Sequence, residues 1–152
     1  MVPPELIKRV TSVLGSEVPT VHGQTETSPV LTQTRGDDPF EDICETVGQA
    51  LPQIEIAIRD PQTNAVTPIG AQGEICSRGY CNMLGYNDNP KATAETIDAE
   101  GWLHTGDLGT MDQRGYVKVT GRVKEMIIRG GENLFPAEIE NVLLEHASIA
   151  EC

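Results

Sequence analysis

The sequence predicts an α+β fold with a β-rich, barrel-like middle. Short segments with apolar residues at every second position, typical of half-buried strands, gather between residues 47 and 121. Helical patterns occur near both ends of the chain, and one short helix lies between the strands. Because turn-forming residues separate the strand segments, we expect a small antiparallel sheet or an open barrel.

The first helix is expected to begin at Pro3 and Pro4 and to end near Gly15. Proline suits the first turn of a helix, and glycine is common directly after the last turn. A short strand, Val18 to His22, should follow and lead into the polar loop GQTETSPV, a kind of junction that often contacts ligands. Four apolar residues at helical spacing predict one buried face of the helix: Leu6, Val10, Val13 and Leu14.

The middle of the chain should contain several strands. QIEIAIRD places isoleucines at positions 54, 56 and 58, so that they share one face, and PQTN follows as a turn. GEICSRG and YVKVTGR are predicted as further strands, with MDQRG as the hairpin connection before the second of them. The helix NPKATAETI interrupts this region, with Asn89 as its cap and Pro90 in its first turn.

The segment GRVKEMIIRGGEN, residues 121–133, predicts a strand and then a turn. The apolar run from Met126 to Ile128 suits a buried strand, and Gly130-Gly131 permits a sharp turn or the close approach of a ligand. The segment lacks the Gly-Lys-Ser/Thr spacing of a nucleotidase phosphate loop. A last helix is expected near Pro136, with one face formed by Ile139, Val142, Leu143 and His146. The sequence stops at SIAEC, where another apolar run begins.

The charge of the chain argues against nucleic acid as a partner. Eleven basic and 23 acidic residues among 152 give a formal net charge of -12, which repels a phosphate backbone and an anionic membrane surface. The sequence has no apolar run near the roughly 20 residues that span a bilayer, and MVPPELIKRV lacks the apolar core of a signal peptide. We therefore expect no transmembrane segment and a cytoplasmic location.

The cysteines and histidines do not indicate a metal site by their spacing. Cys44, Cys76, Cys81 and Cys152 form no Cys-x-x-Cys pair and have no histidine at zinc-site spacing. His22, His104 and His146 are scattered along the chain. The expectation is therefore reduced thiols with structural roles.

A few polar residues are candidates for ligand binding, and each also has an ordinary structural interpretation. Thr25 and Glu26 could bind a phosphate and its divalent cation, or could form a polar turn. Asp107, after Gly106, could accept from two ribose hydroxyls or cap a turn. Arg122, fifteen residues later, could be returned to the same edge by the hairpin, or could form a surface ion pair.

Four motifs in a fixed order decide between these interpretations. HGQTETSP, GEICSRGYCNMLGYNDNP, GWLHTGDLG and GRVKEMIIRGGENLFPAEIE together resemble the adenylate-forming superfamily, and within it the acyl-CoA synthetases of fatty or medium-chain acids. The resemblance covers residues 3 to 152. It implies an enzyme that uses ATP, Mg²⁺ and coenzyme A: a carboxylic acid reacts with ATP to give an acyl-adenylate and pyrophosphate, and coenzyme A then gives the thioester.

The resemblance also implies roles for residues of the first and third motifs. Thr25 corresponds to the residue that holds the nucleotide phosphate, and Glu26 to the magnesium ligand, with Gly23 and Gln24 in the same nucleotide-binding loop. His22 stands where the family usually has an aromatic residue, often tyrosine, beside the adenine, and an imidazole can still stack there. Asp107 and Arg122 correspond to the pair that binds the ribose.

The last motif implies a joint between two domains that move. Lys124, otherwise interpreted as a solvated side chain, corresponds to the hinge residue, and Gly130-Gly131 to the turn that lines the pantetheine tunnel. Three parts are expected: residues 1–46 as the end of the large α/β subdomain with its nucleotide loop, 47–121 as the barrel-like subdomain, and 122–152 as the hinge and the start of the small C-terminal domain.

Two elements of the family pattern are absent from these residues. The Ser/Thr/Gly-rich phosphate loop ending in Pro-Lys and the C-terminal lysine that stabilises the adenylate are not found. The chain is therefore expected to be a fragment, inactive in isolation, whose partners include the missing parts of its own parent chain. Two alternatives stay open: a non-catalytic truncated module, and an adenylation enzyme that loads a carrier protein. The sequence does not define the acyl chain length.

Overall fold

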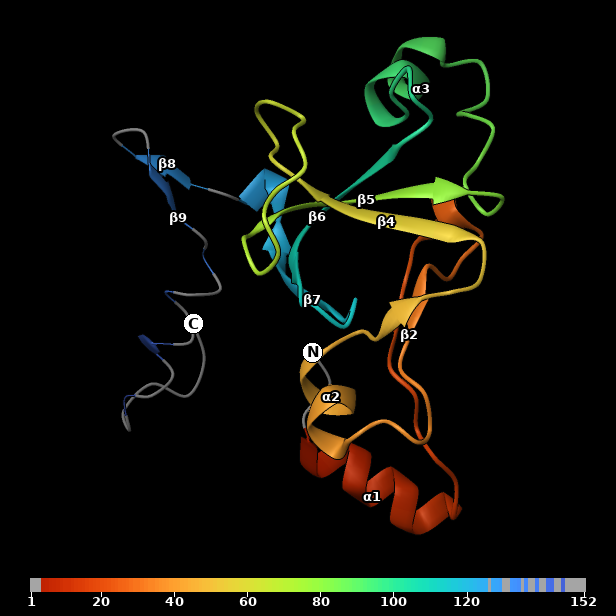
Figure 1. The fold of residues 1–152 in the computed structure, drawn as a ribbon, viewed down its shortest axis with the longest axis vertical. Coiled ribbons are helices and arrows are strands. Elements are labelled where there is room, and N and C mark those ends of the chain that lie inside the picture. Colours follow the sequence, from red (N-terminus) through yellow and green to blue (C-terminus); the bar gives the residue numbers. More distant parts are fainter. Residues whose placement is uncertain are drawn as a thin grey trace.

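The computed structural model describes residues 4–125, 127–129, 132–134, 136, 139, 142–143 and 146. Two antiparallel sheets form its main body, with helices beyond opposite ends of it (Figure 1). One sheet has three short strands in the order β1-β2-β3, and the other has four strands in the order β4-β5-β6-β7. The described part of the chain therefore has the predicted α+β composition with open antiparallel sheets.

Helix α1, Pro4–Leu14, has the predicted extent but not the predicted buried face. Gly15 ends it with a φ of 62° and donates its N–H to Thr11 O at 2.9 Å. Ile7 is its buried residue, at 3% exposure, whereas Leu6, Val13 and Leu14 are exposed. The prediction of a buried face through those three leucine and valine residues is wrong, because within this chain the buried side of the helix is that of Ile7, which lines a small hollow together with Phe40 and Ile43.

The three-stranded sheet consists of β1 Val21–His22, β2 Thr32–Gln33 and β3 Gln49–Ala50. Strand β1 covers only the end of the predicted segment Val18 to His22. Helix α2, Phe40–Glu45, lies between β2 and β3 in the sequence. Threonine hydroxyls help to hold this region: buried Thr32 Oγ1 donates to Val47 O at 2.7 Å, and half-buried Thr20 Oγ1 donates to Ile43 O at 2.8 Å.

The four-stranded sheet contains β4 Ile54–Arg59, β5 Gly73–Gly79, β6 Leu103–Met111 and β7 Val117–Arg122. It confirms the three predicted strands and the MDQRG hairpin, whose ends pair Met111 with Val117. Strand β6 was not predicted, since the sequence around Gly106 was interpreted as a turn. The main core lies against this sheet and contains Val47, Ile58, Ile75 and Val117.

Helix α3, Pro90–Thr96, confirms the predicted cap, because Asn89 Oδ1 accepts from Ala92 N at 3.1 Å. The strands β8 Ile127–Arg129 and β9 Glu132–Leu134 pair antiparallel, which confirms the predicted strand. The prediction that this strand is buried is wrong for Ile127, which is 47% exposed. The predicted glycine turn at 130–131 lies outside the described residues, as does most of the predicted last helix.

Candidate functional site

The candidate site is built on a bulge in strand β6. Glu74 of β5 pairs with Leu108 of β6, and Cys76 pairs with His104. One residue of β5 therefore lies opposite three residues of β6, so β6 carries two extra residues there. Gly106 lies in the bulge with a φ of 75°, a conformation that glycine adopts without the usual side-chain strain. Such bulges redirect side chains. Here the next residue, Asp107, is turned towards β1 and β7.

The carboxylate of Asp107 lies between a histidine and an arginine from distant parts of the sequence. Its Oδ2 is 2.9 Å from His22 Nε2, and its Oδ1 accepts from Arg122 Nε at 2.8 Å. The Asp107 side chain is only 15% exposed. Burial raises the pKa of this carboxyl, but the hydrogen bond from His22 and the charge of Arg122 outweigh it, so the pKa lies below the ordinary value.

Strand pairing explains why Arg122 reaches Asp107. The two residues are direct partners in the β6–β7 ladder, so the hairpin returns the chain to the same edge as predicted. The Arg122 side chain is 58% exposed and ends β7 at the surface. It can therefore contact both Asp107 and a ligand bound from the solvent side.

His22 joins the HGQTETSP motif to this carboxylate. Its side chain is 10% exposed, and its backbone oxygen accepts from Leu31 N at 2.8 Å. While Nε2 contacts Asp107, the buried Nδ1 has no hydrogen-bond partner among the described residues. Gly23 follows where any side chain would overlap the carbonyl of Pro29, so the loop needs glycine at this position.

The loop after His22 forms the 3-10 turn η1, Thr25–Thr27. Thr27 is fully buried and fixes the turn, because Gln24 N donates to its Oγ1 at 3.0 Å and Oγ1 donates to Gln24 O at 2.9 Å. Thr25 is exposed and Glu26 is half-buried. The buried turn thus presents Thr25 and Glu26 three and four residues beyond His22.

Glu26 also has a partner that the sequence did not predict. Tyr86 donates its hydroxyl to Glu26 Oε1 at 2.8 Å, and this hydrogen bond raises the pKa of the tyrosine. The backbone oxygen of Glu26 accepts from Met83 N at 2.8 Å. The second motif, which contains both partners, therefore holds the first one in place.

The remaining predicted site residues lie towards the C-terminal end. Lys124 is exposed in the 3-10 turn η2, Val123–Glu125, directly after β7. Gly130 and Gly131 are outside the described residues.

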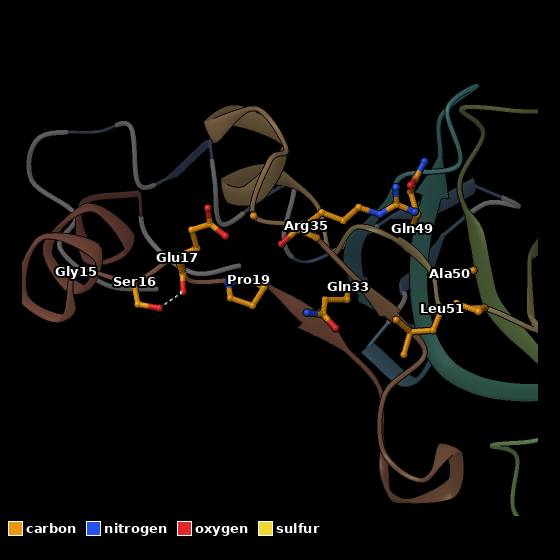
Figure 2. A pocket seen from close by; sticks show the side chains of 12 residues that line it. Gly15, Ser16, Glu17, Pro19, Gln33, Arg35, Gln49, Ala50 and Leu51 are labelled. Atoms are coloured by element: carbon orange, nitrogen blue, oxygen red, sulfur yellow. Dashed lines mark hydrogen bonds between the residues drawn. The ribbon is translucent and has the colours of Figure 1, made fainter.

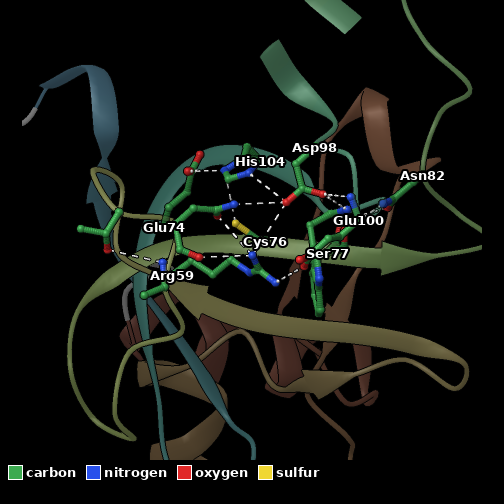
Figure 3. A network of polar contacts seen from close by, with 12 residues as sticks. Arg59, Glu74, Cys76, Ser77, Asn82, Asp98, Glu100 and His104 are labelled. Atoms are coloured by element: carbon green, nitrogen blue, oxygen red, sulfur yellow. Dashed lines mark hydrogen bonds and ion pairs between the residues drawn. The ribbon is translucent and has the colours of Figure 1, made fainter. Parts of the chain in front are cut away.

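A second polar cluster lies beside the bulge, and sequence spacing did not reveal it. Glu74, Cys76 and His104 place possible metal-ligating atoms within 4.8 Å of one another (Figure 3). The histidines are scattered in the sequence, but strand pairing sets Cys76 opposite His104, with Sγ 3.5 Å from Nδ1. Burial, followed by the charge of Glu74, raises the pKa of the Cys76 thiol to about 12. These contacts favour a protonated thiol in a hydrogen-bonded cluster.

A hollow of about 690 Å³ lies away from these residues, between the end of α1 and the three-stranded sheet. Figure 2 shows Glu17, Gln33 and Leu51 around it, with the Arg35 side chain extending towards Gln49. None of the predicted site residues lines it. The candidate site around Asp107 therefore lies outside this hollow.

Within the described part of the chain, no helix has the length and apolar character needed to cross a membrane.

Comparison with known proteins agrees with the motif order. Residues 1–87 match the family described as AMP-binding enzyme. The YngI protein of Bacillus subtilis is 47% identical over 150 residues, covering 98% of this chain and 27% of that protein. The mitochondrial medium-chain acyl-CoA ligase ACSF2 of Bos taurus is 42% identical, covering 98% of this chain and 24% of the ligase. This chain therefore spans about a quarter of the length of these relatives.

Solved structures give the same result. ATP-bound MatB from Rhodopseudomonas palustris matches with a TM-score of 0.83 at 32% identity, covering 97% of this chain and 29% of MatB. O-succinylbenzoate coenzyme A synthetase from Bacillus subtilis in complex with AMP matches with a TM-score of 0.79 at 34% identity, covering 98% and 30%. The amide bond synthetase McbA from Marinactinospora thermotolerans matches with a TM-score of 0.80 at 31% identity, covering 97% and 30%. The chain belongs to the AMP-binding enzyme family, whose members among its relatives include acyl-CoA synthetases and ligases.

Proposed function

We propose that this chain is part of a longer ATP-dependent acyl-CoA synthetase, called the complete parent below. The parent would convert a carboxylic acid, ATP and coenzyme A into acyl-CoA, AMP and pyrophosphate through an acyl-adenylate. One observation carries the proposal: the buried carboxylate of Asp107 is held between His22, at the start of the HGQTETSP loop, and Arg122.

Asp107 is suited to bind the ribose of the nucleotide. A carboxylate has about four acceptor positions, so its two oxygens can accept from two adjacent hydroxyls. Its pKa is lowered, which keeps it ionised and a strong acceptor near neutral pH. Ribose hydroxyls would compete with His22 for Oδ2. The released imidazole would then be free to lie against the adenine, the role that the family resemblance implies.

Thr25 and Glu26 are suited to the phosphate end of the nucleotide. An exposed Thr25 hydroxyl can donate to a phosphate oxygen. Glu26 fits a magnesium ligand, because its bond with Tyr86 occupies only part of the acceptor capacity of the carboxylate. When bound, the cation would offset negative charge on the phosphates. Gly23 and Gln24 shape the loop that brings these side chains to the nucleotide.

The second half of the reaction involves the C-terminal residues. Lys124 is proposed as the hinge between residues 47–121 and the small domain that begins near 122, and residues 1–46 as the end of the large domain. Its position in an exposed turn after β7 supports this assignment, because hinge residues often lie at the ends of elements. Gly130 and Gly131 are proposed to line the pantetheine tunnel for coenzyme A.

The acid and the acceptor are the least constrained parts of the proposal. Medium-chain acyl-CoA ligases among the relatives favour a fatty acid, whereas an O-succinylbenzoate coenzyme A synthetase and an amide bond synthetase show how widely family members differ. A carrier-protein-loading adenylation enzyme is the alternative. The proposed location is cytoplasmic, although ACSF2 relatives are named as mitochondrial.

The experiment is a pyrophosphate-release screen of the complete parent with acids of graded chain length, with and without coenzyme A. Release that depends on a fatty acid, followed by thioester formation, would support the proposal. Adenylate formation with transfer only to a carrier protein would favour the alternative, and no release with any acid would favour a non-catalytic module. The isolated 152-residue chain is expected to form no thioester, because positioning by the missing phosphate loop and lysine cannot be replaced.

A further inference from the structure

We infer that Glu74 is a positioning residue for the nucleotide site: its buried carboxylate fixes the bulged turn that aims Asp107, and His104 holds that carboxylate in place. The inference rests on the proposed role of Asp107 in ribose binding. It gives Glu74 and His104, two members of the second polar cluster, a role in the site that the sequence motifs do not indicate.

In the bulge, side chains accept hydrogen bonds from backbone N–H groups. The two extra residues of β6 interrupt the regular ladder with β5. Glu74 Oε1 accepts from Gly106 N at 2.9 Å, and Thr105 Oγ1 accepts from Asp107 N at 3.1 Å while donating to Ile75 O at 2.7 Å. The residue before Asp107 and Asp107 itself are therefore both held by side-chain acceptors.

The other oxygen of Glu74 is held by a histidine. Glu74 Oε2 is 2.7 Å from His104 Nδ1, and the second ring nitrogen, Nε2, is 3.9 Å from Asp98 Oδ2 (Figure 3). Asp98 is itself anchored, since its Oδ1 accepts from the backbone N–H of both Glu100 and Trp102 at 2.9 Å. A continuous series of polar contacts thus runs from the loop before β6 to the turn that carries Asp107.

The burial of Glu74 makes this arrangement more than a surface contact. The residue is 8% exposed, and a buried carboxylate is costly unless both oxygens have partners. An alanine in its place would leave Gly106 N–H without its acceptor. The turn would then be free to rotate, and Asp107 would no longer be aimed at a ligand.

Ribose recognition gives a readout that a purely structural role would not change. The affinity of the complete parent for AMP is compared with its affinity for 2′,3′-dideoxyAMP, by titration calorimetry in buffer with EDTA. The ratio of the two affinities measures what the ribose hydroxyls contribute. The variants are Glu74→Ala, Glu74→Gln, Asp107→Asn and the double variant Glu74→Ala/Asp107→Asn. Glu100→Ala is the matched control, because this exposed carboxylate lies near the second polar cluster and pairs with Arg59, whereas Gly106 N donates to Glu74.

We expect Glu74→Ala to lower the ratio by about tenfold or more, the cost of losing a hydrogen bond to a charged group. Glu74→Gln should keep most of the ratio, since its amide oxygen can still accept from Gly106. Glu100→Ala should leave it unchanged. In the double variant, Glu74→Ala should add nothing to the effect of Asp107→Asn, because both act through one carboxylate.

Several outcomes would overturn the inference. An unchanged ratio in Glu74→Ala, or fully additive effects in the double variant, would assign Glu74 a structural role only. Loss of AMP binding by the wild-type protein in EDTA, restored by Zn²⁺, would make the cluster a metal site. If Glu74→Ala does not fold, His104→Ala carries the test, and an unchanged ratio there contradicts the inference. If Asp107→Asn itself leaves the ratio unchanged, the proposed ribose site fails, and the inference fails with it.

Discussion

Replacing Asp107 by asparagine tests the proposed ribose site most directly. In the wild type, His22 Nε2 and Arg122 Nε lie 2.9 Å and 2.8 Å from the two oxygens of Asp107. The asparagine side chain has the same size but no charge, and its NH₂ group would face the N–H donor of one of these two residues. The variant therefore loses a charged acceptor in a site whose side chain is 15% exposed. Hydrogen bonds to charged groups contribute about 1.5 to 3 kcal/mol, so AMP affinity should fall about 10- to 150-fold.

The assay is titration of the complete parent with AMP near neutral pH. Glu55→Gln is the control, because Glu55 is another arginine-paired carboxylate, bound by Arg78 at 2.8 Å, but exposed and on β4. Its AMP affinity should equal that of the wild type. A fall in AMP affinity with no matching fall for 2′,3′-dideoxyAMP locates the effect at the ribose. If Asp107→Asn binds AMP as tightly as the wild type, the assignment of Asp107 to the nucleotide site is refuted.

Three further predictions concern the hinge, the thiols and acid stability. Lys124→Pro in the complete parent should retain adenylate formation but lose thioester formation in single-turnover kinetics, because proline fixes φ, whereas Lys124→Ala should do much less; equal loss of both steps would indicate misfolding. Cys76 should react with a thiol reagent only after unfolding in urea, since burial raises its pKa to about 12 and disfavours the thiolate; fast modification of this cysteine in the native chain, located by peptide mapping, would contradict the structure. Asp42, bound by Arg114 at 2.8 Å, has a lowered pKa because of that hydrogen bond, so its contribution to stability should be complete above the ordinary value of 3.8 and lost as pH falls through the lowered one. Urea unfolding at a series of pH values should show a weaker loss of stability in acid for Asp42→Asn than for the wild type.

Regular local patterns could be predicted from the sequence. The isoleucines of QIEIAIRD form one face of β4, with Ile54 and Ile58 buried, because alternation requires only that one face of the strand packs on the core. The cap of α3 was equally predictable, since Asn89 bonds to a backbone group three residues away. Both depend on neighbours that are close in the sequence.

Helix α1 shows where such reasoning fails. Its apolar residues occur on more than one side, and periodicity could not show that Ile7, and not Leu6 or Leu14, faces the rest of this chain. The buried side of a helix depends on what packs against it. In this chain Ile7 lines a small hollow together with Phe40 and Ile43, which lie more than 30 residues further along the sequence.

Only part of the candidate site could be derived from spacing. The hairpin between Asp107 and Arg122 indicated that they return to one edge, and the ladder pairs them directly. The contact between His22 and Asp107 joins residues 85 positions apart, and the contact between Glu74 and His104 joins residues 30 apart. Both depend on which strands become neighbours, which no local pattern specifies.

The order of buried residues along β6 explains both why the sequence does not predict this strand and why Asp107 faces the candidate site. Leu103 and Thr105 are buried, and strict alternation would place Asp107 on the same buried face. Instead Leu108 is buried, three positions after Thr105, so burial stops following strict alternation where β6 carries its two extra residues. This irregularity hides the period-two pattern in the sequence, which is why the sequence alone favours a turn here. It also removes the carboxylate from the core face and turns it towards His22 and Arg122, so the irregularity that obscures the strand is what makes Asp107 available to a ligand.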